Sequence, residues 1–104
     1  MKRPKIIKAL QSVLHRVAPE ATAILYGSEA RGEARPDSDI DLLILVDKEK
    51  LTLQEQQDIT FPLYDIEVEN GVLINPLVVL RKHWETLHSI TPFYKNVMRE
   101  GVIL

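Results

Sequence analysis

Two kinds of hydrophobic spacing alternate along the first half of the chain. Over residues 5–18 the apolar side chains fall on one helical face, which predicts an amphipathic helix that ends at Pro19. Residues 22–26 (TAILY) predict a short buried strand that ends at Gly27. Residues 40–46 (IDLLILV) are almost continuously apolar, which is typical of a central strand covered on both faces. This half therefore predicts a helix followed by two strands.

Local signals define the segments around these strands. Residues 28–33 (SEARGE) predict a short helix with Ser28 as its N-terminal cap, and residues 36–38 (PDS) predict a turn. Thr52 and Glu55 have the spacing of a capping box, which predicts a helix start directly after Thr52.

The segment 64–69 (YDIEVE) allows two interpretations. Its apolar and acidic residues alternate, so that it would form a hairpin strand before an Asn70-Gly71 turn. Alternatively, the preceding helix continues to about residue 69 and Gly71 caps its C-terminus, with a kink or break at Pro62. We favour the helix, because Asn-Gly serves either structure whereas the capping box gives the helix a definite start.

The last third of the chain predicts one more strand and one more helix. Residues 72–80 predict a strand in both interpretations, and Pro76 inside it indicates an edge position or a bulge. Residues 92–100 predict a final helix, and Trp84 and Phe93 are interpreted as core or interface residues. This element order predicts an α/β (α+β) domain with a small sheet of three to four strands.

Composition narrows the class of protein. A chain of 104 residues is long enough for one domain with a real core, so residues 1–104 are interpreted as a single domain. The 45% hydrophobic and 27% charged residues are typical of a soluble globular protein. The net charge of −2 argues against a non-specific nucleic-acid binder, and the absence of cysteine excludes disulfides and thiolate chemistry. No apolar run has the length of a membrane span and the basic N-terminus lacks a signal-peptide core, so we expect a cytoplasmic protein. The basic residues near the N-terminus are interpreted as a solubilising cluster: Lys2, Arg3, Lys5 and Lys8.

Two acids stand one residue apart at the start of the second predicted strand. Because residues two apart on a strand point to the same face, the carboxylates of Asp39 and Asp41 are expected to lie side by side. Two anions this close repel each other unless a cation stabilises both. Mg²⁺ suits this arrangement, since it is commonly bound by one or two carboxylates together with substrate phosphates and water.

The turn after the first predicted strand offers anion-binding groups. Gly27 allows close approach of the backbone to a ligand, Ser28 supplies a hydroxyl, and Arg31 and Arg35 can complement phosphate charge. There is no G-K-[ST] of a Walker A loop, and GSEARG lacks the G-x-G-x-x-G pattern of a dinucleotide fold. Together with the two acids, this turn predicts a site for a metal-bound nucleoside triphosphate.

Gly27-Ser28, ten further residues and then Asp39-Ile40-Asp41 resemble the motif of the DNA polymerase beta-like nucleotidyltransferase superfamily. The stretch YGSEARGEARPDSDIDLLI is most similar to the minimal nucleotidyltransferases of bacteria and archaea. The resemblance implies a nucleotidyltransferase fold, with a small mixed sheet flanked by helices. It also implies transfer of a nucleoside monophosphate from a triphosphate, ATP by expectation, with Mg²⁺ or Mn²⁺ as the metal. Gly27, Ser28 and Arg31 would hold the nucleotide, and Asp39 and Asp41 would be the catalytic metal ligands. Proteins of this type are often antitoxins encoded beside a HEPN-domain ribonuclease, which implies such a partner protein.

One departure from the family pattern affects the predicted activity. The superfamily places a third carboxylate on the next core strand, but residues 72–80 contain no acid, and Asn75 is the only polar side chain there. Glu67 or Glu69 would contribute only if 64–69 were a strand. Two hypotheses follow. The first is an enzyme that transfers a nucleoside monophosphate to a hydroxyl of a protein or RNA, and the alternative is a catalytically weak or inactive antitoxin-like module that acts by docking to a partner. The sequence leaves open the acceptor, the nucleotide base and whether the chain forms homo- or hetero-oligomers.

Overall fold

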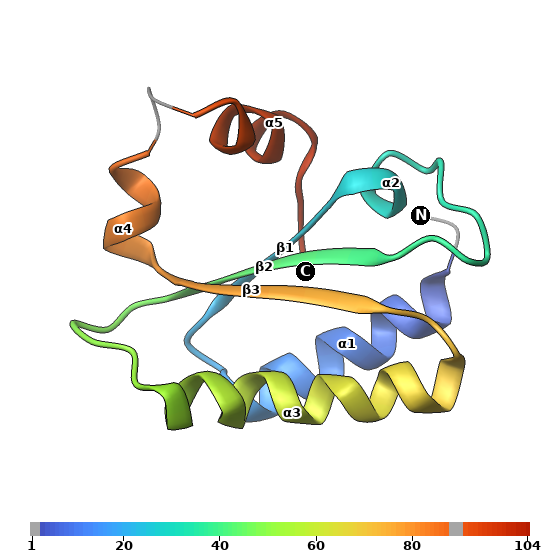
Figure 1. Cartoon of the computed structure of the whole chain (residues 1–104), viewed down its shortest axis with the longest axis horizontal. Coiled ribbons are helices and arrows are strands. Elements are labelled where there is room, and N and C mark those ends of the chain that lie inside the picture. Colours follow the sequence, from blue (N-terminus) through green and yellow to red (C-terminus); the bar gives the residue numbers. More distant parts are fainter. Residues whose placement is uncertain (1–2, 88–90) are drawn as a thin grey trace.

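A four-stranded mixed sheet forms the centre of the protein (Figure 1). The computed structural model describes residues 3–87 and 91–104. The strands lie in the order β3-β2-β1-β4, where β1 is antiparallel to β2 and β4, and β2 is parallel to β3. Their bounds are β1 Thr22–Tyr26, β2 Ile40–Val46, β3 Ile74–Leu80 and β4 Val102–Ile103. The predicted α/β class with a small mixed sheet is confirmed.

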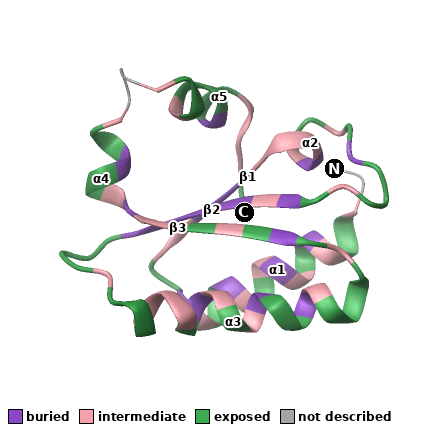
Figure 2. Cartoon of the chain, viewed as in Figure 1, coloured by how far each residue is buried: buried purple, intermediate pink, exposed green. Residues whose placement is uncertain are grey.

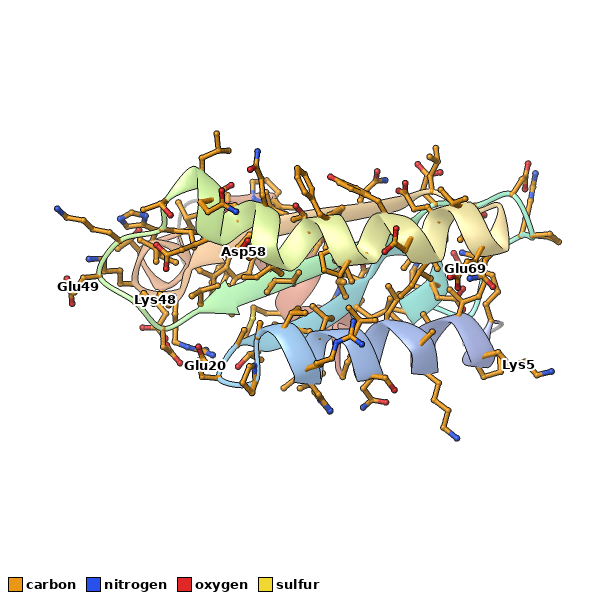
Figure 3. All side chains as sticks on the ribbon, turned by 90° about the horizontal axis from the view of Figure 1, so that it is seen from below. Lys5, Glu20, Lys48, Glu49, Asp58 and Glu69 are labelled. Carbon is orange, nitrogen blue, oxygen red and sulfur yellow. The ribbon has the colours of Figure 1, made fainter. Side chains whose placement is uncertain are left out.

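Helices α1 (Pro4–Val17) and α3 (Leu53–Asn70) cover one face of this sheet. Their inward side chains, such as Leu10 and Leu63, are fully buried against alternate residues of the strands (Figure 2). In Figure 3, which views the protein from below, the two helices lie side by side in front of the sheet, and the side chain of Lys5 extends outward from α1. This layer is the larger of the two hydrophobic clusters.

The opposite face of the sheet carries α4 (Arg81–Glu85) and α5 (Pro92–Glu100). Trp84 of α4 and Val97 of α5 are buried there against Leu43 and Leu45 of β2. Because side chains alternate along a strand, the residues that follow on this face towards the start of β2 are Asp41 and then Asp39. The apolar cover therefore ends where the two acids begin.

The helical interpretation of residues 64–69 is confirmed. Thr52 and Glu55 form both hydrogen bonds of the capping box at the start of α3. The helix runs through Pro62 without a break and ends at Gly71, whose φ of 65° is left-handed. β3 is an edge strand, which agrees with Pro76 inside it, but it begins at Ile74 rather than at residue 72.

The predicted short helix after β1 is present, but it is shorter than residues 28–33 and its predicted Ser28 cap is wrong. Helix α2 spans only Gly27–Ala30, and its N-terminal cap is Tyr26, with extended backbone and no side-chain cap hydrogen bond. Gly27 has a φ of 75°, so the turn from β1 into α2 is made by glycine backbone rather than by serine capping. Within residues 3–87 and 91–104, no helix is long and apolar enough to cross a membrane.

Candidate functional site

A row of three side chains crosses the sheet at the end that the apolar cover leaves open. Tyr26 of β1 is the register partner of Asp41 of β2, and Asp41 is the partner of Asn75 of β3. Partners in register point to the same face, so Tyr26, Asp41 and Asn75 face the same side as Asp39. Asp41 is half-buried, whereas Asp39 and Asn75 are exposed and therefore accessible to a ligand.

Asn75 bridges the two predicted acids. Its Nδ2 donates to Asp39 Oδ2 at 3.1 Å and to Asp41 Oδ1 at 3.3 Å. The two carboxylates therefore lie together, as their spacing predicts, and their oxygens converge on one partially positive amide group. Asn75 is also the residue on the neighbouring strand that faces both acids, which is where a third carboxylate would stand.

Gly27 lies against the Asp41 carboxylate. A Cβ atom built on Gly27 would lie 2.3 Å from Asp41 Oδ2, which no side chain tolerates without movement of Asp41. The backbone of the turn is therefore as close to this carboxylate as glycine alone permits. The phenol of Tyr26 lies in the same environment, where burial and then the negative charge of Asp41 raise its pKa.

The predicted nucleotide-binding residues lie together around α2. Gly27 and Ser28 begin this helix and Arg31 follows it directly. Arg31 is held by two carboxylates: its Nε donates to Glu33 Oε2 at 2.9 Å, and its Nη1 donates to Glu100 Oε2 at 3.1 Å. Arg35 lies further along the exposed loop, where its backbone N–H donates to the Ser38 hydroxyl.

Glu100 is a site residue that sequence reasoning missed. Its Oε1 accepts from the Gly27 backbone N–H at 3.2 Å and from Arg31 Nη1 at 3.3 Å. Glu100 is the last residue of α5, 73 positions from Gly27. The available signal was its position, because an acid in the last turn of a helix is disfavoured by the helix dipole and so needs another reason to be there.

A buried ion pair supports α2 from the N-terminal side. Glu29 is fully buried, and Arg3 Nε donates to its Oε1 at 2.5 Å. Arg3 Nη1 also donates to the backbone carbonyl of Ser38 at 2.6 Å, just before Asp39. The interpretation of Arg3 as part of a solubilising cluster is therefore wrong. Lys5 and Lys8 are exposed, and Lys2 lies outside the described residues.

Comparison with known proteins identifies this arrangement. The family model described as nucleotidyltransferase domain matches residues 5–104, almost the whole chain. The chain belongs to the nucleotidyltransferase domain family. The resemblance of the Gly27-Ser28 and Asp39-Ile40-Asp41 motif to this class of protein is thereby supported by the chain as a whole.

Within this family, the chain is similar to two individual proteins. The solved structure of a candidate minimal nucleotidyltransferase superposes with a TM-score of 0.66 at 27% identity, covering 100% of this chain and 97% of that one. A candidate protein adenylyltransferase of Methanocaldococcus jannaschii is 44% identical over 55 residues, which are 53% of this chain and 54% of the relative. The match therefore spans about half the length of that curated relative.

The donor atoms of this candidate site fit a divalent cation. Asp39 and Asp41 offer carboxylate oxygens that already converge on the Asn75 amide, and oxygen is the ligand that Mg²⁺ prefers. Within residues 3–87 and 91–104, no group of three or more acidic, histidine or cysteine side chains is placed to hold a metal ion. Phosphates and water would therefore complete the coordination. Glu67 and Glu69 do not supply a third acid, because both lie on α3 and Glu67 accepts from the Ile74 backbone N–H.

Proposed function

We propose that the protein transfers adenosine monophosphate from ATP to a hydroxyl group of a partner protein in a Mg²⁺-dependent reaction. The observation that carries the proposal is the convergence of Asp39 and Asp41 on one point, directly beside a glycine turn that leaves no room for a Cβ atom. A metal-bound triphosphate requires ligands for the cation and hydrogen-bond donors for the phosphates. The two acids can supply the first, and the backbone N–H groups and the arginine can supply the second.

The side chains divide the work in this proposal. Asp39 and Asp41 hold Mg²⁺, which, when bound, offsets the charge of the phosphates. The Gly27 backbone N–H, the Ser28 hydroxyl and the Arg31 guanidinium hold the triphosphate. Their positioning of the α-phosphate in line with the acceptor hydroxyl supplies most of the rate enhancement.

The reaction forms one bond and breaks one bond. The acceptor oxygen bonds to the α-phosphorus while the bond from the α-phosphorus to the bridging oxygen of the β-phosphate breaks, and pyrophosphate leaves. Asn75 is an amide and cannot accept the hydroxyl proton, so the proton passes to Asp41 or to water. This difference from a three-acid site predicts slow turnover.

A protein acceptor, rather than RNA, is supported by one relative and by the net charge of the chain. One relative is named as a candidate protein adenylyltransferase, which favours a protein hydroxyl. The net charge of −2 disfavours RNA. The partner proposed from the sequence resemblance is a co-encoded HEPN-domain protein.

A second candidate function is favoured by Asn75 itself. Its amide donates to both acids, which stabilises their charges without a metal and removes the position for a third acid. In this alternative the protein is a catalytically inactive module that neutralises its partner by docking.

The test incubates the protein with Mg²⁺, the co-encoded partner and ATP labelled either at the α- or at the γ-phosphate. Label transferred from the α-position alone, in a protease-sensitive product, supports protein adenylylation, whereas a nuclease-sensitive product indicates RNA. Transfer from the γ-position would contradict nucleotidyl transfer. The variant D39N/D41N should lose transfer, while the matched control Asp37→Asn, an exposed turn residue, should retain it. Absence of transfer, with partner binding intact in both, would leave the docking module as the function.

A further inference from the structure

Glu100 has an unusual place in the molecule. It is the last residue of α5, immediately before Gly101 and strand β4. Its carboxylate reaches across to the turn after β1, where it accepts from the Gly27 backbone N–H at 3.2 Å and from Arg31 Nη1 at 3.1 Å. Only 17% of the Glu100 side chain is exposed, so burial restricts its carboxylate to these contacts.

The two groups that Glu100 binds are donors assigned above to the triphosphate. A carboxylate and a phosphate present the same kind of anionic oxygen acceptor to a backbone N–H and a guanidinium. A donor hydrogen that points at Glu100 is not available to a phosphate oxygen. Glu33 also accepts from Arg31, through Nε at 2.9 Å, but its side chain is 65% exposed, so water readily replaces this contact.

The negative charge around the site also disfavours binding of a triphosphate. Burial acts to raise the pKa of Glu100, but the hydrogen bonds from Arg31 and the Gly27 backbone, together with the positive charges of Arg31 and Arg99, outweigh it and lower the pKa from its ordinary value. Glu100 is therefore an anion at neutral pH. With Asp39 and Asp41 nearby, it makes the nucleotide-free site more negative, which opposes the entry of a polyanionic triphosphate.

We propose that Glu100 is an internal competitor of the nucleotide: it occupies the triphosphate donors Gly27 N–H and Arg31 and leaves them when the triphosphate binds. This inference rests on the proposed nucleotide site. Glu100 thereby lowers the affinity for the nucleotide, because binding must first break the hydrogen bonds from the Gly27 N–H and from Arg31 Nη1 to an ionised carboxylate. The favourable contact also offsets the unfavourable position of an acid in the last turn of α5.

The opposite role gives the opposite experimental sign. If Glu100 only positioned Gly27 and Arg31 for the nucleotide, removing its carboxylate would loosen these donors and weaken binding. A competitor predicts tighter binding on removal. The direction of the change in affinity therefore separates the two roles.

The experiment measures binding of inorganic triphosphate and of Mg²⁺-ATP by isothermal titration calorimetry to wild type, Glu100→Ala, Glu100→Gln and Glu33→Ala. We expect roughly tenfold tighter binding for E100A and a smaller gain for E100Q, whose amide oxygen still accepts from Gly27. Glu33→Ala is the matched control, because Glu33 is also an acid bound to Arg31 but its described contacts do not include Gly27. It should change the affinity by less than about twofold. Circular dichroism and thermal unfolding verify that each variant is folded.

The outcomes distinguish this inference from the proposed function. Equal or weaker binding by both E100A and E100Q, or an equal gain in E33A, would overturn the competitor role. So would a failure of E100A to bind inorganic triphosphate at millimolar concentration. Tighter binding by E100A without transfer of label to any acceptor would uphold the competitor role while rejecting the enzymatic function.

Discussion

Replacement of Gly27 by alanine tests the close approach on which the site depends. The backbone at Gly27 has a φ of 75°, and a Cβ atom there would lie 2.3 Å from Asp41 Oδ2 and 3.2 Å from its Cγ. The left-handed backbone costs a non-glycine residue about 1 kcal/mol or somewhat more. Displacing the Asp41 side chain also breaks its hydrogen bond with Asn75, which adds about 1 kcal/mol. We expect Gly27→Ala to lower the free energy of unfolding by about 2 to 3 kcal/mol.

Gly32 provides a control in which alanine meets only the cost of the left-handed backbone and displaces no side chain. Gly32 has a nearly identical φ of 73°, it lies in the loop after α2, and a Cβ atom on it would meet nothing within 4 Å. Gly32→Ala should therefore lower the free energy of unfolding by about 1 kcal/mol. It should leave the positions of Asp39 and Asp41 unchanged.

Urea denaturation of wild type, G27A and G32A gives the free energies, and calorimetry gives the affinity for Mg²⁺-ATP. We expect G27A to weaken binding by roughly tenfold, since the displaced Asp41 carboxylate loses a charge-assisted contact of about 1.5 kcal/mol. G32A should bind as wild type does. The reasoning is refuted if the two variants lose equal stability and both retain nucleotide binding.

Three other changes test separate parts of the molecule. Asn75→Asp places a third carboxylate beside the other two, so the free energy of unfolding should fall by about 1 kcal/mol without metal. Mg²⁺ should restore this stability, and the variant should transfer label faster than wild type. An equal Mg²⁺-induced shift of Tm in wild type and variant would contradict this. Arg3→Met removes the ion-pair partner of the buried Glu29 and should lower the free energy of unfolding by about 3 kcal/mol in urea denaturation; a loss below about 1 kcal/mol would show that the pair contributes little. A hydrogen bond from Lys48 is the largest of the interactions that lower the pKa of Glu55 to about 2. Because an acid with a lowered pKa stabilises the fold above its unfolded pKa of 4.5 and loses this as pH falls through about 2, Glu55→Gln should flatten the pH dependence of unfolding between these values. An unchanged pH profile of E55Q would rule this out.

The fold was predictable where local chemistry decided between alternatives. Periodicity alone did not identify α3, because its outer face also carries apolar side chains: Phe61 is 55% exposed and Val68 is 86% exposed. The capping box of Thr52 and Glu55 identified it, since it involves only residues close in sequence, and the left-handed Gly71 at the end of α3 agrees with this choice. Strand β2 was predictable because its almost continuous apolar run is typical of a central strand that is covered on both faces.

The site was predictable only in part, because its remaining contacts are long-range. The spacing of Asp39 and Asp41 on a strand was sufficient to place their carboxylates together. That Asn75 would face both acids required the register of β2 and β3, which the sequence alone does not specify. The Arg3–Glu29 pair and the Glu100 contacts join residues 26 and 73 positions apart, and no local pattern indicates such partners.

The turn that carries the site is held from both ends of the described chain, and this affects the order of folding. Arg3 binds α2 and the loop before Asp39, whereas Glu100 binds the turn at Gly27. Closing the long loop between Gly27 and Glu100 costs more entropy than pairing β1 with β2 or β2 with β3, so we expect the Glu100 contact to form after these pairings. We therefore expect the turn at Gly27, where we propose that the nucleotide binds, to become ordered late in folding. We expect the Gly27 amide to exchange its hydrogen through local opening well before the amides of central strand β2, so that the protein can lose its site while keeping its core.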